Sequence, residues 1–152
     1  MDIRTYSPLT LAYIGDAVYD LIFRTMVVAK GNTSANRLHN RTIQFVKAPA
    51  QAQLVELIME ELTDEELTVY KRGRNAKPYT MTKNATMGEY KKATGIEALT
   101  GYLYLTERTE RILELIQIGL HKMEAQEGNE SGRQDAGNRS KRGSYRGKKC
   151  CH

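Results

Sequence analysis

Residues 11–19 read LAYIGDAVY, an apolar run with a single acid inside it. Ser7 can cap a helix that begins just before this run, and Pro8 then takes the first helical position, where its missing N–H costs nothing. Gly31 is suited to end the helix. The sequence therefore predicts a helix over residues 8–29, in which apolar and small residues recur at helical spacing, namely Leu11, Ala12, Gly15, Val18, Tyr19, Ile22 and Met26.

The apolar pattern along the rest of the chain predicts five further helices, over about 34–47, 50–61, 63–72, 87–105 and 106–123. Pro49 is expected to separate the second helix from the third, and Thr106 can cap the last. Thr63 followed by Glu66 matches a capping box. Residues 73–86 contain Gly, Asn and Pro with little apolar content, so they are predicted as a loop. Because no β-type alternation of useful length occurs, the expected fold class is all-α.

The chain divides by composition into two parts. Residues 1–124 carry a net charge of +1 and hold nearly all of the apolar residues, which is enough for one domain with a hydrophobic core. Residues 125–152 hold seven basic and three acidic residues and almost nothing apolar. We therefore expect a disordered basic tail there, which either adds unspecific attraction to a nucleic acid or is an inert solvated end.

The sequence also indicates where the protein works. Its N-terminus lacks a charged region followed by an apolar run, and no window approaches 18 apolar residues without charge. The only cysteines, Cys150 and Cys151, are adjacent near the end of the chain and cannot staple a core, which fits a reducing compartment. We expect a cytoplasmic protein that does not associate with a membrane.

Charge is segregated along the chain. Residues 56–66 hold six acids and no base, whereas residues 71–92 hold seven bases and one acid. A basic segment of this kind suits a phosphate backbone, although a solvated loop without a ligand explains it equally. The bases that we expect to contact such a backbone are Arg72, Arg74, Lys77 and Lys83, with weaker candidates in Lys91 and Lys92.

Two acids lie inside otherwise apolar helical segments: Asp16, and Glu97 within the run 93–103. A carboxylate among apolar neighbours is costly unless it is paired or binds a metal. Each acid has a glycine close before it, Gly15 and Gly95, which lets a backbone or a ligand approach. Carboxylates that converge from two helices would suit Mg²⁺. The alternative is two ordinary acids, each in a salt bridge or at an exposed helix edge.

These segments also resemble a known family. Residues 11–18, LAYIGDAV, look like the signature helix of the ribonuclease III family, and residues 96–105, IEALTGYLYL, look like its second catalytic helix. Between them, residues 71–77, KRGRNAK, resemble the Mini-III branch, which has the catalytic domain without a double-stranded-RNA-binding domain. By position, Asp16 and Glu97 match the family's catalytic, metal-binding acids.

The resemblance implies a ribonuclease III catalytic-domain-like helical bundle and a Mg²⁺-dependent endoribonuclease that cuts double-stranded RNA. It also implies a homodimer with one active site per subunit, and, for the Mini-III branch, maturation of the large-subunit (23S) ribosomal RNA precursor. The apolar content around residues 12–19 and 98–105 fits a buried partner surface, although a monomer core explains the same residues.

The chain departs from longer family members at two positions. Ala12 stands four residues before Asp16, and Thr94 three residues before Glu97, where those members have acids. Fewer carboxylates are therefore expected at the metal; Thr94 either holds a metal-bound water or is only a helix-surface residue. Asp20 either extends the acidic site or is a solvated surface acid. A non-catalytic helical RNA-binding or ribosome-assembly protein, with structural acids, is the main alternative function.

Overall fold

The computed structural model describes residues 2–77 and 85–139 of the chain, with side chains up to residue 132. These residues form six α-helices and two short 3-10 helices, η1 (Ile3–Thr5) and η2 (Met59–Glu61), and no strand occurs among them. The predicted all-α fold class is therefore confirmed. The α-helices are α1 (Pro8–Ala29), α2 (Ala35–Val46), α3 (Ala48–Ile58), α4 (Asp64–Arg74), α5 (Met87–Leu105) and α6 (Thr109–Arg139).

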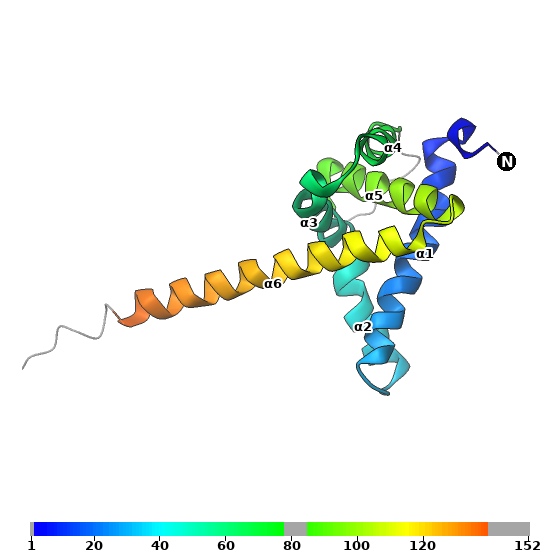
Figure 1. The fold of residues 1–152 in the computed structure, drawn as a ribbon. Helices are drawn as coiled ribbons and strands as arrows, with labels where there is room; N and C mark the ends of the chain where they lie inside the picture. The colour runs from blue at the N-terminus through cyan, green and yellow to red at the C-terminus, as the bar shows by residue number, and fades with distance from the viewer. Residues whose placement is uncertain (1, 78–84, 140–152) are drawn as a thin grey trace, which may run out of the picture.

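Helix α5 lies at the centre of the bundle. It contacts α1, α3, α4 and α6, and its most extensive contact is with α1 (Figure 1). Every residue from 93 to 103 is buried except Glu97, which is half-buried. Because residues 93–103 are apolar or small on nearly every side of the helix, neighbours must cover this stretch all round, and its one acid becomes conspicuous.

Several helix starts and one helix end match the sequence signals. Ser7 caps α1 by accepting a hydrogen bond from the Leu9 amide, and Thr63 and Glu66 form both bonds of a capping box at α4. After α1, Gly31 has a φ of +144°, a conformation that side chains rarely allow. These signals act locally, so the sequence is sufficient to locate them.

Three predicted details are wrong. Pro49 does not separate two helices but lies in the first turn of α3, where no helical N–H bond is lost. Thr106 does not cap the last helix; it ends α5, and its hydroxyl donates to the Tyr102 carbonyl at 2.8 Å. Helix α4 continues to Arg74, so the first part of the predicted loop is helical.

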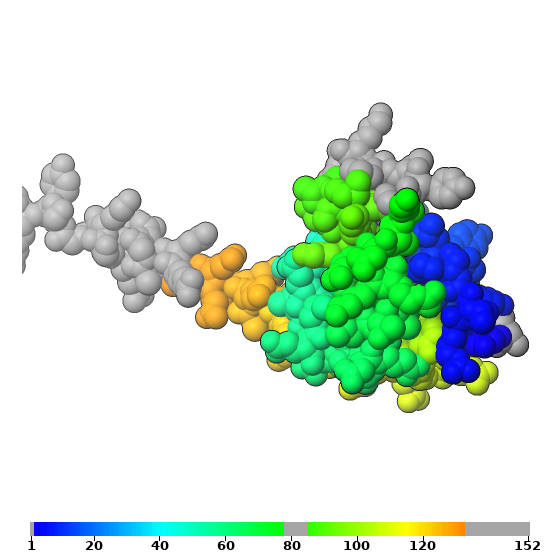
Figure 2. Space-filling view, turned by 90° about the horizontal axis from the view of Figure 1, so that it is seen from above, coloured from blue at the N-terminus to red at the C-terminus, as the bar shows by residue number. Residues whose placement is uncertain are grey.

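The last helix is longer than predicted. We expected it to end near residue 123, but α6 continues to Arg139 and so enters the predicted disordered tail. Figure 2 shows α6 up to residue 132, in yellow and orange, leaving the body of the bundle. Its residues 124–132 are exposed, so tertiary packing does not hold them and the helix here is local. Residues 140–152 lie outside the described residues.

The core fills the space around α5. Its largest fully buried side chains include Tyr19 and Phe23 from α1, Leu54 from α3, Tyr70 from α4 and Leu99 from α5. These side chains come from four helices, so the core fixes where each helix crosses α5. No helix in the described part of the chain is long and apolar enough to cross a membrane.

Candidate active site

Glycines bring the backbones of α1 and α5 into contact. A Cβ atom added to Gly15 would lie 2.7 Å from both the Glu97 carbonyl carbon and the Gly101 nitrogen. A Cβ atom on Gly101 would lie 2.9 Å from the Leu11 carbonyl carbon. Real Cβ atoms essentially never come that close to backbone, so only glycine permits this crossing. The crossing places Asp16, the neighbour of Gly15, beside Glu97.

The Asp16 and Glu97 side chains line the same two cavities. One, of about 680 Å³, lies between α1, α3 and α5 and is also bordered by Gln51 and Lys47. The other, of about 450 Å³, lies along α1 and includes the exposed Tyr13. The two carboxylates therefore meet where the cavities adjoin, as expected for residues that act together.

The two acids are less buried than their apolar neighbours suggested. Asp16 is exposed and Glu97 is half-buried. Within residues 2–77 and 85–132, neither carboxylate forms a salt bridge, which removes one of the two ordinary roles considered for them. Glu97 does accept one hydrogen bond, from the Gln51 side-chain amide at 3.2 Å.

The electrostatics at Glu97 favour a cation. Burial raises the pKa of the Glu97 carboxyl well above its usual range, and the nearby Asp16 carboxylate raises it further. The hydrogen bond from Gln51 acts in the opposite direction and lowers that pKa. Since burial and the Asp16 carboxylate both disfavour the charge of Glu97, and no basic partner offsets it in the described residues, a divalent ion between the two carboxylates would stabilise the site.

The donor set fits a hard cation held by few protein ligands. In the described part of the chain, no three His, Cys, Asp or Glu side chains gather closely enough to hold a metal. A site of two carboxylates leaves most positions around the ion for water, which is how Mg²⁺ usually binds. Asp16 and Glu97 are thus the residues that would hold it.

Of three further residues considered for the site, only Thr94 lies beside the two carboxylates. Thr94 is buried, lines both cavities, and donates its hydroxyl to the Tyr90 carbonyl at 3.0 Å, so it is not a surface residue. Asp20 forms a salt bridge with Arg24 at 2.6 Å and borders neither cavity. Gly95 faces the Tyr70 ring on α4, so its close approach serves helix packing rather than the site.

Three of the predicted RNA-contact residues, Arg72, Arg74 and Lys77, lie in the last turn of α4 or just after it. The Arg72 guanidinium donates to the Tyr6 carbonyl at 3.4 Å, and Arg74 lies 5.7 Å from the centre of the Tyr70 ring. Lys77 is exposed, and Lys83 lies outside the described residues. Arg72, Arg74 and Lys77 have no acidic partner within the described residues. Of the weaker candidates, Lys91 is exposed, whereas Lys92 forms a salt bridge with Glu56, which offsets its charge.

Three polar residues of the cavity of about 680 Å³ were not predicted from the sequence as site residues. Gln51 contacts Glu97 directly, whereas Lys47 and Tyr90 line the cavity walls. Gln51 is the one that a sequence signal marks, because it stands at a core position of the helix that contains it. Lys47 and Tyr90 carry no local signal, since a lysine between two helices and a tyrosine in a helix are common.

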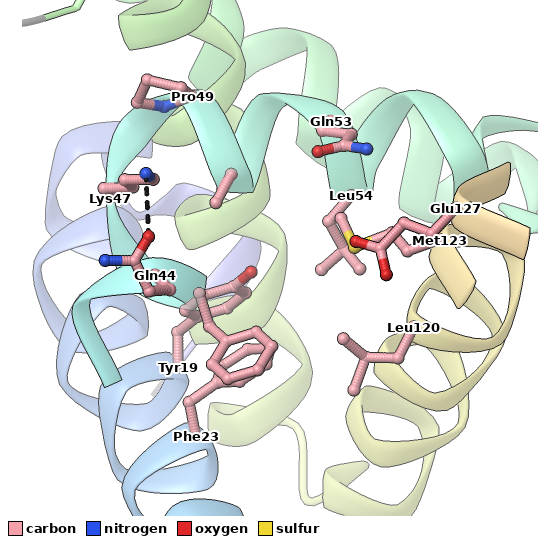
Figure 3. Close-up of a pocket in the computed structure, with 12 residues that line it drawn as sticks. Tyr19, Phe23, Gln44, Lys47, Pro49, Gln53, Leu54, Leu120, Met123 and Glu127 are labelled. Carbon is pink, nitrogen blue, oxygen red and sulfur yellow. Dashed lines mark hydrogen bonds between the residues drawn. The ribbon is translucent and has the colours of Figure 1, made fainter. Parts of the chain in front are cut away.

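A separate cavity of about 520 Å³ lies on the other side of the junction between α2 and α3 (Figure 3). Its walls are mostly aromatic and aliphatic, and the Phe23 and Phe45 rings stack with their centres 5.2 Å apart. Lys47, whose amine donates to the Gln44 side chain at 3.1 Å, borders both this cavity and the one with the acids. Glu127 is the one acid along its wall, so this cavity cannot supply a carboxylate pair.

Residues 9–108 match the model of the ribonuclease III domain, and the chain therefore belongs to the ribonuclease III family. A Mini-ribonuclease 3 from Clostridium tetani is 45% identical over 85% of this chain and 86% of that protein. A Mini-ribonuclease 3 from Staphylococcus aureus is 47% identical over 75% of this chain and 87% of its own length. A crystal structure of a protein from Fusobacterium nucleatum is similar with a TM-score of 0.72 and 33% identity, covering 80% of this chain and 98% of that one.

These findings confirm the family, the fold class and the prediction of a metal-dependent endoribonuclease. They disfavour the alternative of a non-catalytic RNA-binding or ribosome-assembly protein, because the similarity spans both segments that contain the acids. The family match ends at residue 108, so it covers α1 to α5 and leaves α6 outside.

Proposed function

We propose that this chain cuts double-stranded RNA with Mg²⁺ held by Asp16 and Glu97, and that it matures the large-subunit (23S) ribosomal RNA precursor. The observation that carries the proposal is the convergence of these two carboxylates in shared cavities, without a basic partner in the described residues. The family match and the Mini-ribonuclease 3 relatives support the substrate class. We place the activity in the cytoplasm, where such a precursor and two reduced cysteines are expected.

The protein's own residues perform three tasks in this reaction. Asp16 and Glu97 would hold the cation beside the α1–α5 contact. When bound, the ion supplies an activated water and offsets negative charge on the phosphate. Thr94 already donates its hydroxyl proton to the Tyr90 carbonyl, so toward a water in the cavity it would act only as an acceptor. The α1–α5 contact keeps the two carboxylates at one separation.

Cleavage of a defined RNA duplex and of precursor ribosomal RNA, with Mg²⁺ or with EDTA, tests the proposal. Asp16→Asn and Glu97→Gln are each expected to lower the single-turnover rate by at least about 100-fold, while RNA binding in EDTA stays near wild type. Asp20→Asn is the matched control, because Asp20 lies one turn further along α1 and is bound to Arg24. Near wild-type cleavage by either site variant would remove the assignment.

The bases at the end of α4 are proposed to contact RNA phosphates. Duplex RNA is read mainly through its phosphates and 2′-hydroxyls, which suits guanidinium and amine groups without an acidic partner. Replacing Arg72, Arg74 and Lys77 by Gln should reduce the slope of log affinity against log salt by about 2 to 3, since each lost phosphate contact removes roughly 0.9. Lys92→Gln is the control, because its charge is already offset. An unchanged slope in the triple variant would refute the contact.

A second copy of the chain is proposed to cover the outer face of α1. Tyr13 is 84% exposed, and Leu21 and Val28, two and four turns further on, are also exposed. An apolar stripe of this length on a single helix is typical of a protein interface. Since Tyr13 lines the cavity along α1, the partner would pack beside the carboxylates and give one site per subunit.

A further inference from the structure

Gln51 is the residue whose burial is hardest to explain by packing alone. It lies on α3 with 2% of its surface exposed, and the other buried residues of this helix are apolar. A primary amide at such a position costs free energy unless it is hydrogen-bonded, and a leucine would fill a similar volume without that cost. A buried amide in an apolar row therefore calls for a polar partner of some importance.

That partner is Glu97. The Gln51 amide donates from Nε2 to Glu97 Oε1 at 3.2 Å, and this is the only hydrogen bond that the Glu97 carboxylate accepts from the described residues. The bond joins α3 to α5 across 46 positions of sequence, so both partners are held by rigid helices. It occupies one carboxylate oxygen and leaves the other for the cavity that both residues share with Asp16.

We propose that Gln51 is a positioning residue of the carboxylate pair: it holds the Glu97 carboxylate turned toward Asp16, ready for the cation. The inference rests on the proposed function of Asp16 and Glu97 as the metal-binding pair. A hydrogen bond from a fixed donor to a carboxylate restricts its rotation and favours its charged form. Partners that orient a metal ligand in this way commonly change metal affinity by 10- to 100-fold.

A pair of glutamine substitutions on the same helix separates this role from simple packing. Gln51→Leu removes the donor and keeps the volume. Gln53→Leu is the matched control, since Gln53 is exposed and borders the separate cavity of about 520 Å³, away from the carboxylates, as Figure 3 shows. Thermal melting of both full-length variants first establishes that each is folded.

Mn²⁺ binding without RNA, followed by electron paramagnetic resonance, gives the direct readout. Mn²⁺ takes the same oxygen ligands as Mg²⁺. Gln51→Leu is expected to bind Mn²⁺ 10- to 100-fold more weakly than wild type, whereas Gln53→Leu should match wild type. A folded Gln51→Leu protein with wild-type Mn²⁺ affinity would overturn the proposal. If Gln51→Leu does not fold, Gln51→Met serves in its place with the same two outcomes.

Cleavage kinetics add a second readout that a merely structural role would not produce. The single-turnover rate of Gln51→Leu should fall at low Mg²⁺ and recover in part at high Mg²⁺, while RNA affinity measured in EDTA stays unchanged. A lower rate that no Mg²⁺ concentration improves would contradict the role. If the wild-type chain neither binds Mn²⁺ nor cuts duplex RNA, the proposed function itself fails; if it does both and Gln51→Leu equals it, only the role of Gln51 fails.

Discussion

Gly15→Ala is the substitution that tests most directly how the fold makes the site. The added Cβ atom would be placed 1.7 Å from the Glu97 carbonyl oxygen, whereas real Cβ atoms essentially never come closer than 3.0 Å to such an atom. Helices α1 and α5 would therefore have to separate by at least about 1.3 Å. The atoms that this Cβ would meet, in Glu97 and Gly101, all belong to the backbone, so no side chain can rotate away to relieve the clash.

The expected change in the free energy of unfolding follows from two opposing effects. Alanine favours a helix over glycine by about 1 kcal/mol, which would stabilise the protein. Forcing two packed helices apart costs about 1–3 kcal/mol, and the upper end applies here because α1 makes the largest contact with α5. The net loss is then about 2 kcal/mol, which lowers Tm by about 4–8 °C in a chain of this size.

The same displacement should affect cleavage more than stability. Asp16 moves with Gly15, so the two carboxylates would separate, and a misplacement of about 1 Å in an active site can cost roughly 100-fold in rate. Circular dichroism melting and single-turnover cleavage of duplex RNA measure both effects on the full chain.

Gly88→Ala is the matched control for this experiment. Gly88 lies in the first turn of α5, and the nearest atom to an added Cβ there is the Thr86 hydroxyl oxygen at 4.0 Å. With no clash to oppose it, alanine should raise Tm by up to about 2–4 °C and leave cleavage unchanged. A Gly15→Ala protein that melts at or above wild type and cuts RNA normally would refute the argument.

Three further outcomes are expected. Burial alone would raise the pKa of Glu66, but Arg111 and the capping bonds of Thr63 outweigh it and keep that pKa below its ordinary value. The stability that Glu66 contributes is therefore present above about pH 4.3 and is lost as the pH falls through the lowered pKa of the folded state. Glu66→Gln should lower the free energy of unfolding in urea by about 3 kcal/mol at pH 7 and flatten this acid dependence. Because the pKa of Glu97 is raised in the folded protein, ionisation of its carboxyl destabilises the fold when EDTA removes metal. Tm should therefore rise as the pH falls from this raised pKa toward about 4.3. An equal rise in Glu97→Gln would show that Glu97 does not cause it. Leu21→Glu should convert a dimer to a monomer in light scattering, and a dimer that persists would place the interface elsewhere.

The predictions from sequence succeeded where the signal was local. The helix over 8–29, its Ser7 cap and the capping box at Thr63 each depend on a few neighbouring residues, so their chemistry is legible in the chain. Pro49 and Thr106 were misjudged because each is compatible with two roles. Which role applies depends on whether the helix continues past the residue, and the residues next to it in the sequence do not decide that.

For the site, the sequence alone identified Asp16 and Glu97 as acids in apolar helices, and the family resemblance gave them a shared purpose. Only the tertiary structure brought them to common cavities, through the contact of Gly15 and Gly101 with the facing backbone. It alone placed Gln51 against Glu97, a residue 46 positions away in the sequence. The physical reason is range: helix formation depends on residues a few positions apart, whereas the charge and hydration of a carboxylate depend on whatever distant segment the fold lays beside it.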